Sequence, residues 1–370
     1  MSPPPSSSSP SPTAPSGDQL PGEPAPVVPS AGPSRTLYVD SGTAIVRRRS
    51  GRVVVERPDG DDREECMSVP AVDIERVVLV GQVHCTSAAQ RFFLEQGIDT
   101  IFLSWNGRLK GRLDSSSSPR SELRLAQYRA HDATGERVLL ARAFIRAKLS
   151  NMQTMLRRYA RRRSAPALSE SADTVSDLKR RAAHAEDLDG LRGMEGQATR
   201  VYYEAWPLFI NRSDPMFSFS ERTRRPPEDA VNALLSFGYT LLLGDMQVAC
   251  ATVGLDPSLG FLHTLRRGCP SCALDLVEAF RPTVADSVVL RLLNECRIAP
   301  DDVKSRDEGV FLTRSGREAF YAAYEERRQT TVTPPGFGSP IAYHRAFEAQ
   351  ARMLARSLTS GADYVPFTIR

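Results

Sequence analysis

The stretch PEDAVNALLSFGYTLLLGDMQVACATVG, residues 227–254, is the most apolar helical pattern in the 370-residue chain. Its uncharged run from Ala230 to Gly244 is 15 residues long. An α-helix needs about 20 apolar residues to cross a bilayer. We therefore expect this stretch to be the central core helix of a helical domain, and we expect no membrane association.

Helical patterns continue on both sides of this stretch, from about residue 124 to the C-terminus. Residues 164–190 are polar, and we expect them to form part loop and part short helix. A chain of this length can hold two domains with sizeable cores, so the helices predict one large all-α C-terminal domain over residues 120–370. The other expected helical segments are 137–162, 191–209, 286–294, 315–328 and 342–358.

The residues before the helical region have the pattern of a small β-rich domain, residues 35–113. Short alternating apolar runs flank Ser50 and Gly51, and β-branched runs follow at 74–81 and 99–107. One helix is expected from Thr86 to Gln96. A polar break at 113–122 separates this region from the helices, so the predicted fold class is α+β with two domains.

The first 34 residues consist almost entirely of Pro, Ser, Gly, Ala and Thr. Such a composition cannot bury enough apolar surface to offset the entropy of ordering, so we expect residues 1–34 to be a disordered tail. The tail has no basic residue and lacks the apolar run of a secretory signal. We therefore expect a cytoplasmic protein.

The formal net charge of +4 understates the charge of the expected folded part. The tail contributes Asp18 and Glu23 and no base, which leaves 48 basic and 42 acidic residues. The excess is concentrated between Arg137 and Ser169, where nine Lys or Arg occur without an acid. A solvated helical face usually mixes both signs, whereas unbalanced Arg and Lys neutralise phosphates. Both interpretations of this segment stay open.

Six cysteines are scattered along the chain, which argues against a disulfide framework in a protein without a secretory signal. Cys269 and Cys272 form a Cys-x-x-Cys pair, which is half of a common zinc site. No second such pair or closely spaced His pair completes four ligands in the sequence. The pair alone does not establish zinc binding or redox chemistry.

The segment GFLHTLRRGCPSCALDLVEAFRP, residues 260–282, places ionisable side chains in an otherwise apolar pattern. Asp275 and Glu278 are three residues apart, so on a helix they share one face. Two carboxylates this close need a positive partner. That partner is either Arg281 or a divalent cation, with His263 as a nitrogen ligand from the preceding loop. A solvated acidic stripe and a capping or core histidine would give the same pattern.

A third candidate ligand is Glu195, which lies between Gly193 and Gly196. Glycine inside a helix costs about 1 kcal/mol relative to alanine. Two glycines around one acid indicate that another chain, ligand or helix approaches the backbone closely there. Alternatively, Gly193 lies before the start of the helix.

Several segments together resemble the CRISPR-associated integrases, the nuclease-integrases of CRISPR spacer acquisition. The most specific is GLDPSLGFLH, which ends at His263 and is followed twelve residues later by DLVE. The likeness runs in order from about residue 36 to the C-terminus. The segments that carry it are TLYVDSGTAIVRR (36–48), LVGQVHCTSAAQRFFLEQGIDTIFLSWNGRLKGRL (79–113), LRGMEGQATRVYYEAW (191–206), DAVNALLSFGYTLLLGDMQVACATVGLDPSLGFLH (229–263), CALDLVEAFRP (272–282) and SGREAFYAAYEERR (315–328).

The resemblance implies that the C-terminal helical domain is catalytic and holds Mg²⁺ or Mn²⁺. Glu195, His263 and Glu278 occupy the positions of the family's metal ligands, and Asp275 has an expected supporting or second-metal role. The segment RRGCPSC, residues 266–272, departs from the family, which more often has Gly-Arg and small or apolar residues there. Cys269 and Cys272 thus have no family explanation.

The resemblance also implies an activity and partners. The protein would join the 3′-hydroxyl ends of short foreign DNA to the CRISPR array by transesterification. It would bind double-stranded DNA, the protospacer and the CRISPR repeat. It would form a homodimer and combine with a small ferredoxin-like CRISPR adaptation partner into a heterohexamer. The basic residues expected to contact DNA are Arg157, Arg158, Arg161, Arg266 and Arg267.

This activity would explain why no Ser or Cys nucleophile is needed, because the attacking hydroxyl belongs to the DNA. A metal held by carboxylates and a histidine stabilises charge on the phosphorane-like transition state, and attack by water at the same site gives a nuclease. His263 could instead act as an acid or base. The alternative function is a non-catalytic DNA-binding scaffold, which would need the fold and the arginines but not the four site residues.

Overall fold

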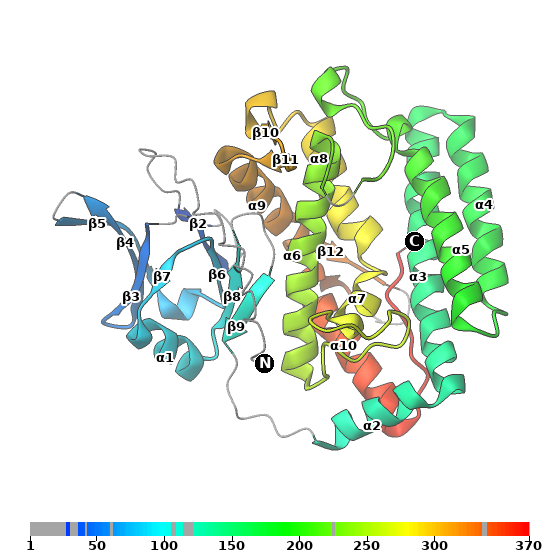
Figure 1. Cartoon of the computed structure of the whole chain (residues 1–370), viewed down its shortest axis with the longest axis horizontal. Coiled ribbons are helices and arrows are strands. Elements are labelled where there is room, and N and C mark those ends of the chain that lie inside the picture. The colour runs from blue at the N-terminus through cyan, green and yellow to red at the C-terminus, as the bar shows by residue number, and fades with distance from the viewer. Residues whose placement is uncertain are drawn as a thin grey trace, which may run out of the picture.

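The computed structural model describes residues 27–29, 36–40, 43–59, 62–104, 109–113, 121–223, 226–334 and 339–369. The strands of the N-terminal domain lie on one side of the molecule and most helices on the other, with α6 (Ala230–Val253) near the boundary (Figure 1). This arrangement confirms the predicted α+β fold, a small β-rich domain followed by a larger helical one.

The N-terminal domain is built from two sheets. In the described residues their strand orders are β1-β2-β6-β8-β9 and β5-β4-β3-β7. Helix α1 (Ser87–Gln96) connects β7 to β8. The strands are β1 (Val27–Pro29), β2 (Thr36–Asp40), β3 (Ile45–Arg49), β4 (Arg52–Asp59), β5 (Asp62–Pro70), β6 (Arg76–Val80), β7 (His84–Cys85), β8 (Asp99–Leu103) and β9 (Leu109–Leu113).

The first sheet is buried on both faces. Leu37 and Val39 on β2 belong to the core of the β-rich domain, whereas Tyr38 between them belongs to the core of the helical domain. This alternation follows from the two-residue period of a strand. It explains why the parallel strand β6 is a continuous apolar run, since both of its faces are covered.

Two local predictions in this domain are confirmed. Ser50 and Gly51 both have positive φ, 46° and 76°, and they join the antiparallel strands β3 and β4. Positive φ at both central residues is the signature of a type I′ hairpin turn. Helix α1 begins after Thr86, whose hydroxyl accepts the N–H of Ala89, and it ends at Gly97 with φ 66°.

The N-terminal boundary differs from the expectation. Most of the predicted disordered tail, residues 1–34, lies outside the described residues, but Val27–Pro29 forms β1, antiparallel to β2. Consecutive β-branched valines favour a strand, and an edge strand tolerates a proline because its missing N–H need not pair. The first sheet therefore begins before residue 35.

The C-terminal domain is mainly helical. Within the described residues it also holds two short hairpins, β10 (Val303–Arg306) with β11 (Gly309–Leu312) and β12 (Thr331–Val332) with β13 (Ile341–Ala342), which the all-α expectation lacked. The remaining helical elements are η1 (Ala71–Asp73, in the β-rich domain), α2 (Ser121–Asp132), α3 (Thr134–Arg163), α4 (Pro166–Ala182), α5 (Leu188–Glu204), η2 (Trp206–Leu208), η3 (Pro215–Phe217), α7 (Ser271–Val277), the π-helix η4 (Arg281–Asp286), α8 (Ser287–Asn294), η5 (Pro300–Asp302), α9 (Arg314–Gln329) and α10 (Tyr343–Ser360).

Helix α4 corrects the expectation for residues 164–190. The segment is polar in composition, yet residues 166–182 form one continuous helix. From the first turn onward, apolar residues recur every three or four positions and are buried, so they form one narrow stripe against the neighbouring helices. These residues are Leu168, Ala172, Val175, Leu178 and Ala182.

Helix α6 is the core helix that the sequence predicts. Among the described helices it alone is long and apolar enough, by length and composition, to cross a membrane. However, 72% of its most apolar window is buried inside the structure.

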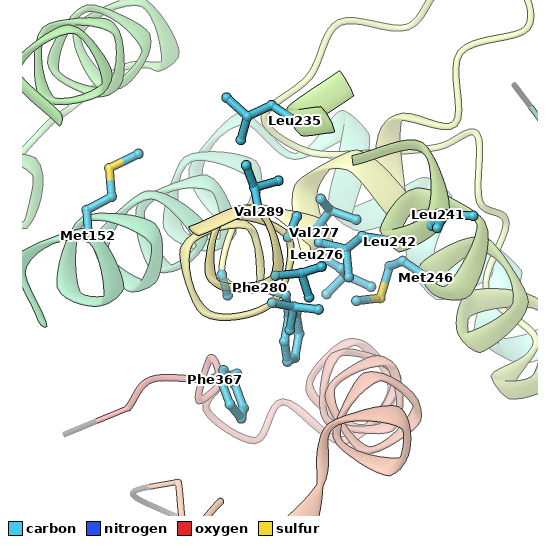
Figure 2. Close-up of a cluster of buried hydrophobic side chains, with 14 of the residues drawn as sticks. Met152, Leu235, Leu241, Leu242, Met246, Leu276, Val277, Phe280, Val289 and Phe367 are labelled. Atoms are coloured by element: carbon cyan, nitrogen blue, oxygen red, sulfur yellow. The ribbon is translucent and has the colours of Figure 1, made fainter. Parts of the chain in front are cut away.

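Leu242 and Met246 of α6 lie in one cluster with Phe280 (Figure 2). The ring of Phe280 stacks on Phe367 near the C-terminus, with ring centroids 4.5 Å apart.

Polar contacts join the two domains. Arg317 Nε on α9 lies 2.7 Å from Asp40 Oδ2 at the end of β2. Tyr38 donates a hydrogen bond of 2.7 Å to Glu325, also on α9. Both carboxylates are buried. Removing Arg317 would leave Asp40 without its close cation, whereas removing Tyr38 would cost a buried hydrogen bond, because Arg328 still balances the charge of Glu325. The β-rich domain is therefore held against the helical domain by specific contacts as well as by apolar packing.

Candidate metal centre

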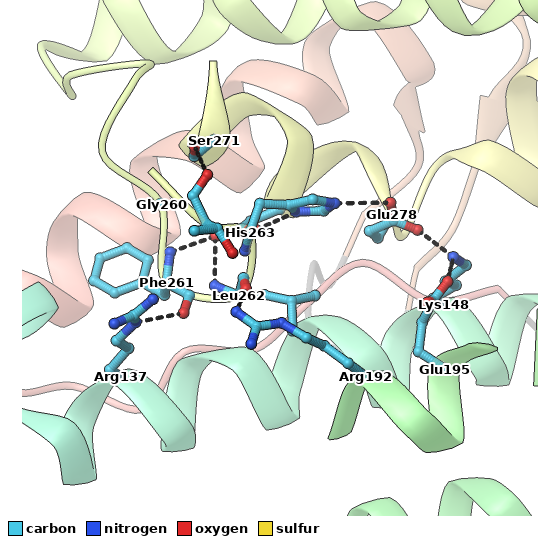
Figure 3. Close-up of polar contacts among 12 residues, drawn as sticks. Arg137, Lys148, Arg192, Glu195, Gly260, Phe261, Leu262, His263, Ser271 and Glu278 are labelled. Carbon is cyan, nitrogen blue, oxygen red and sulfur yellow. Dashed lines mark hydrogen bonds and ion pairs between the residues drawn. The ribbon is translucent and has the colours of Figure 1, made fainter. Parts of the chain in front are cut away.

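The predicted site residues come together where three parts of the helical domain meet. Glu195 lies on α5, His263 on the loop before α7, and Glu278 directly after α7 (Figure 3). A residue that the sequence did not single out, Lys148 on α3, lies between Glu195 and Glu278.

Asp275 organises the loop that carries His263. Its side chain is fully buried, and its oxygens accept the backbone N–H groups of Phe261, Leu262 and His263 at 2.5, 3.0 and 3.0 Å. A Cβ at Gly260 would lie 2.5 Å from a backbone carbon of Ser271, so only glycine allows the loop to pack this closely on α7.

Asp275 also orients the imidazole of His263. Oδ1 of Asp275 lies 2.6 Å from Nδ1 of His263. A carboxylate accepts hydrogen bonds, so Nδ1 carries the proton and Nε2 is left as the ligand or acceptor. Burial lowers the pKa of His263, but the hydrogen bond and charge of Asp275 outweigh burial and raise it above its ordinary value.

These contacts favour one of the two roles expected of Asp275. Because both carboxylate oxygens already accept N–H groups of the protein, the geometry is closer to a supporting role than to a second-metal role.

Glu278 is buried among positive groups. Its Oε1 lies 3.1 Å from Arg281 Nε and 3.9 Å from His263 Nε2, and its Oε2 lies 2.6 Å from Lys148 Nζ. Burial raises the pKa of Glu278, but Arg281 and Lys148 outweigh burial and lower it to about 2. Among the described residues, Oε2 has an ion-pair partner but accepts no hydrogen bond of good geometry.

Glu195 completes the set from the other side of the site. Its Oε1 pairs with Lys148 Nζ and accepts a hydrogen bond of 2.9 Å from Thr199. Lys148 is itself buried, with 5% of its side chain exposed. Burial lowers its pKa, but Glu278 and Glu195 outweigh burial and raise it.

The site contains a pocket of about 420 Å³. Glu195, His263 and Glu278 all contribute to its wall, and Arg266 lies at the same wall. Two carboxylates and an imidazole nitrogen are donors that suit Mg²⁺ or Mn²⁺. The remaining lining residues are Ile145, Arg192, Leu262, Thr264 and Cys269.

The three candidate ligands stand further apart than a bound metal would hold them. Within the described residues, no group of three His, Cys, Asp or Glu side chains is close enough together to hold a metal ion. Figure 3 shows the ammonium of Lys148 between Glu195 and Glu278, where it contacts both carboxylates.

The nine basic residues between Arg137 and Ser169 do not all have the same surroundings. Arg137, Arg142 and Arg163 donate to backbone carbonyls of Phe261, Ala185 and Phe209, so these three support the fold. Lys148 pairs with the two acids. Four of the nine basic residues therefore have partners within the protein, and both interpretations of the segment stay open for the other five.

The predicted DNA-contacting arginines lie in two places. Arg266 lines the pocket and Arg267 beside it is exposed. Arg157 and Arg161 are exposed near the end of α3 and Arg158 is half-buried. At a rise of about 1.5 Å per residue, this second group lies roughly 14 to 20 Å along the helix from Lys148.

Gly193 and Gly196 both lie inside α5, so the alternative that Gly193 precedes the helix is wrong. At either position, a Cβ would meet no described atom within 4 Å apart from the adjoining residues and backbone of α5 itself. The backbone beside Glu195 therefore faces open space, and no part of the described chain approaches it.

Lys148 is the residue of this cluster that the sequence did not single out. It lies four residues after Phe144 and three after Ile145, both buried, so it belongs to the apolar face of α3. The sequence signal that could have identified it is a lysine on the apolar face of an expected helix. A lysine buried there requires a carboxylate partner.

The cysteines take no part in a zinc site within the described residues. All six are free. Cys272 is fully buried beside Cys250 on α6, and that thiol contact and burial raise its pKa. Cys269 is half-buried at the pocket wall.

Comparisons with known proteins agree with one another. A family model described as CRISPR associated protein Cas1 matches residues 37–326. CRISPR-associated endonuclease Cas1 1 of Thermus thermophilus is 36% identical over 333 residues, which is 90% of this chain and 98% of that protein. A CRISPR-associated exonuclease Cas4/endonuclease Cas1 fusion of Geobacter sulfurreducens is 36% identical over 349 residues. That match covers 93% of this chain, but the chain spans only 62% of the fusion's length.

Two solved structures share the fold. One is a casposase bound to integration product, with a TM-score of 0.77 and 21% identity over 90% of this chain and 93% of that one. The other is a Cas6-RT-Cas1–Cas2 complex, with a TM-score of 0.73 and 22% identity over 93% of this chain and 37% of that one.

Proposed function

Because this chain belongs to the CRISPR-associated Cas1 family, we propose that it is a divalent-metal-dependent DNA endonuclease and integrase of CRISPR adaptation. In the proposed reaction, the 3′-hydroxyl oxygen of a short foreign DNA bonds to a phosphorus of the CRISPR array. The bond from that phosphorus to its bridging 3′-oxygen breaks, and this oxygen takes up a proton and leaves as the 3′-hydroxyl of the array strand. The observation that carries this proposal is the convergence of Glu195, His263 and Glu278 on one pocket. A non-catalytic scaffold would not require that convergence.

Glu195, His263 and Glu278 would hold Mg²⁺ or Mn²⁺. When bound, the metal would act as a Lewis acid at the phosphate and lower the pKa of the attacking hydroxyl. Asp275 fixes Nδ1 of His263 in its protonated form, which leaves Nε2 available on the pocket side. Glu278 stays ionised at neutral pH because its pKa is about 2.

The positive groups around the pocket favour a DNA backbone. Arg266 lines the pocket, and the neighbouring Arg267 is exposed. Arginine neutralises phosphates without reading base sequence, which suits an enzyme that takes up foreign DNA of any sequence. The exposed Arg157 and Arg161 would extend the same path along α3.

The proposed partners are double-stranded DNA, a second copy of the chain and a small ferredoxin-like adaptation protein, combined in a heterohexamer. The names of two proteins with this fold support the first and the last of these, since one is bound to an integration product and the other is a Cas1–Cas2 complex.

A matched pair of DNA ends tests the reaction. Purified protein and its adaptation partner are incubated with Mn²⁺, a plasmid carrying a CRISPR repeat, and a labelled short duplex that ends in either a 3′-hydroxyl or a 3′-deoxy nucleotide. We expect label in the plasmid only with the 3′-hydroxyl duplex. Label transfer from both duplexes, or from neither, would contradict transesterification by the DNA end.

A further inference from the structure

Lys148 lies between two of the three candidate metal ligands. Its Nζ pairs with Oε1 of Glu195 and lies 2.6 Å from Oε2 of Glu278. The two carboxylates come from different parts of the chain, α5 and the residue after α7. One ammonium group therefore connects both acids that would ligate the metal.

Lys148 is buried, so water cannot readily take the place of its ammonium group beside the two carboxylates. The side chain is 5% exposed, and the next residue on α3, Leu149, is fully buried. A buried charge is tolerated only when it is paired. Removing the ammonium would leave the buried Glu278 with Arg281 and the more distant imidazole of His263, and it would leave Glu195 with the hydroxyl of Thr199.

The charges of the site show why Lys148 and a metal compete. Without a metal, the carboxylates of Glu195 and Glu278 are balanced by Lys148 and Arg281. A divalent cation on the same oxygens would add two positive charges to a site that is already balanced. Like charges this close repel strongly in a poorly solvated site. The ammonium must therefore leave at least one of the two carboxylates for the metal to bind both.

We propose that Lys148 is a resident cation of the metal centre. It keeps Glu195 and Glu278 paired in the metal-free protein and sets the metal affinity by competing for their oxygens. It is a positioning residue, because it acts on the two carboxylates and not on the DNA. This inference rests on the proposed metal site and goes beyond it by assigning a residue that holds the site when the metal is absent.

The test compares Lys148→Met with the wild-type protein by thermal unfolding and calorimetric titration, in EDTA and across a series of Mn²⁺ and Mg²⁺ concentrations. Methionine keeps the length and unbranched shape of lysine but has no charge. In EDTA we expect a lower melting temperature for Lys148→Met. In Mn²⁺ we expect its melting temperature to rise more than that of the wild type, with a Kd for Mn²⁺ at least about tenfold lower.

Two further variants make the comparison specific. Lys179→Met on α4 is the matched control, since Lys179 is half-buried and its Nζ contacts the neutral Gln153 at 2.7 Å. Its response to Mn²⁺ should equal that of the wild type. Lys148→Gln retains a hydrogen-bond donor without the charge. It replaces Lys148→Met if that variant does not fold in EDTA, and the same tighter Mn²⁺ binding is expected of it.

The outcomes separate this inference from the proposed function. Mn²⁺ binding of equal affinity in the wild type and the Lys148 variants would overturn the role of Lys148 and leave the metal site standing. Binding to none of the proteins would overturn both. Mn²⁺ binding to the Lys148 variants but not to the wild type would also support the inference. It would mean that the lysine excludes the metal under the conditions of the assay.

Discussion

Oδ1 of Asp275 lies 2.6 Å from Nδ1 of His263. The same carboxylate accepts the backbone N–H of His263 and of the two residues before it. One buried side chain therefore fixes the loop, the orientation of the imidazole and the position of its proton. The carboxylate of Glu278, three residues further on, lies 3.9 Å from the other ring nitrogen. The two acids of the DLVE motif thus contact opposite sides of the histidine.

Asp275→Asn should lower both stability and activity. The amide nitrogen would face a backbone N–H whichever way the amide is turned, because both oxygens of Asp275 accept from the backbone. A buried donor left without an acceptor costs about 1–3 kcal/mol. We expect a lower melting temperature and loss of strand transfer. Asp307→Asn, at an exposed position, is the control. Wild-type melting temperature and activity in Asp275→Asn would show that the carboxylate does not have this role.

The stability of the metal-free protein should depend on pH through Glu278. Its pKa is lowered from 4.5 to about 2. A carboxyl group whose pKa is lower in the folded than in the unfolded protein stabilises the fold. This stabilisation is complete above pH 4.5 and is lost as the pH falls toward 2. The contribution is about 3 kcal/mol. The free energy of unfolding in EDTA should therefore differ more between the wild type and Glu278→Gln at pH 7 than at pH 3. A difference that does not change with pH would contradict the charged contacts of Glu278.

Gly193→Ala and Gly196→Ala should stabilise the protein while weakening its function. Neither added methyl group meets a described protein atom, and alanine is about 1 kcal/mol better than glycine in a helix. We expect each melting temperature to rise by a few degrees. We also expect strand transfer to fall, because the open backbone beside Glu195 is where DNA would approach.

The control for the glycine variants is Gly135→Ala, which also lies in a helix with open space at its Cβ. It should be stabilised without losing activity. Full activity in both α5 variants would show that nothing approaches that backbone closely during the reaction.

Replacing Arg157, Arg158 and Arg161 by alanine should weaken DNA binding. Each lost phosphate contact should also reduce the slope of log K against log salt by about 1. Arg180→Ala on α4 is a suitable control, because Arg180 is exposed and pairs with Asp177, much as Arg157 lies 3.7 Å from Asp173. Binding measured by fluorescence anisotropy at several salt concentrations checks both quantities. An unchanged affinity and slope in the triple variant would remove this surface from the DNA path.

Local patterns in the sequence predicted local structure well. The turn at Ser50 and Gly51 requires only positive φ at both residues, and α6 requires only a long apolar run. The polar composition of α4 concealed a helix, because a narrow apolar stripe packed on neighbours is enough to stabilise it. The strand β1 was missed because its pairing with β2 is a contact that short apolar runs do not specify.

The candidate site shows the same limit. The spacing of His263, Asp275 and Glu278 indicated that the three could meet, but it could not show that Asp275 faces the loop backbone instead of the pocket. Lys148 joins the site only because α3 packs between α5 and the end of α7. That arrangement is tertiary, and neither spacing nor composition encodes it.

The metal dependence of strand transfer tests the proposed centre most directly. The wild-type protein, Glu195→Ala and His263→Ala, each confirmed as folded by circular dichroism, are incubated with the adaptation partner, a short 3′-hydroxyl duplex and a plasmid carrying a repeat. The assay is run in EDTA and in increasing Mg²⁺ or Mn²⁺. We expect product only from the wild-type protein and only with metal. Product from the wild type in EDTA, or wild-type yield from either variant, would contradict a metal centre formed by Glu195, His263 and Glu278.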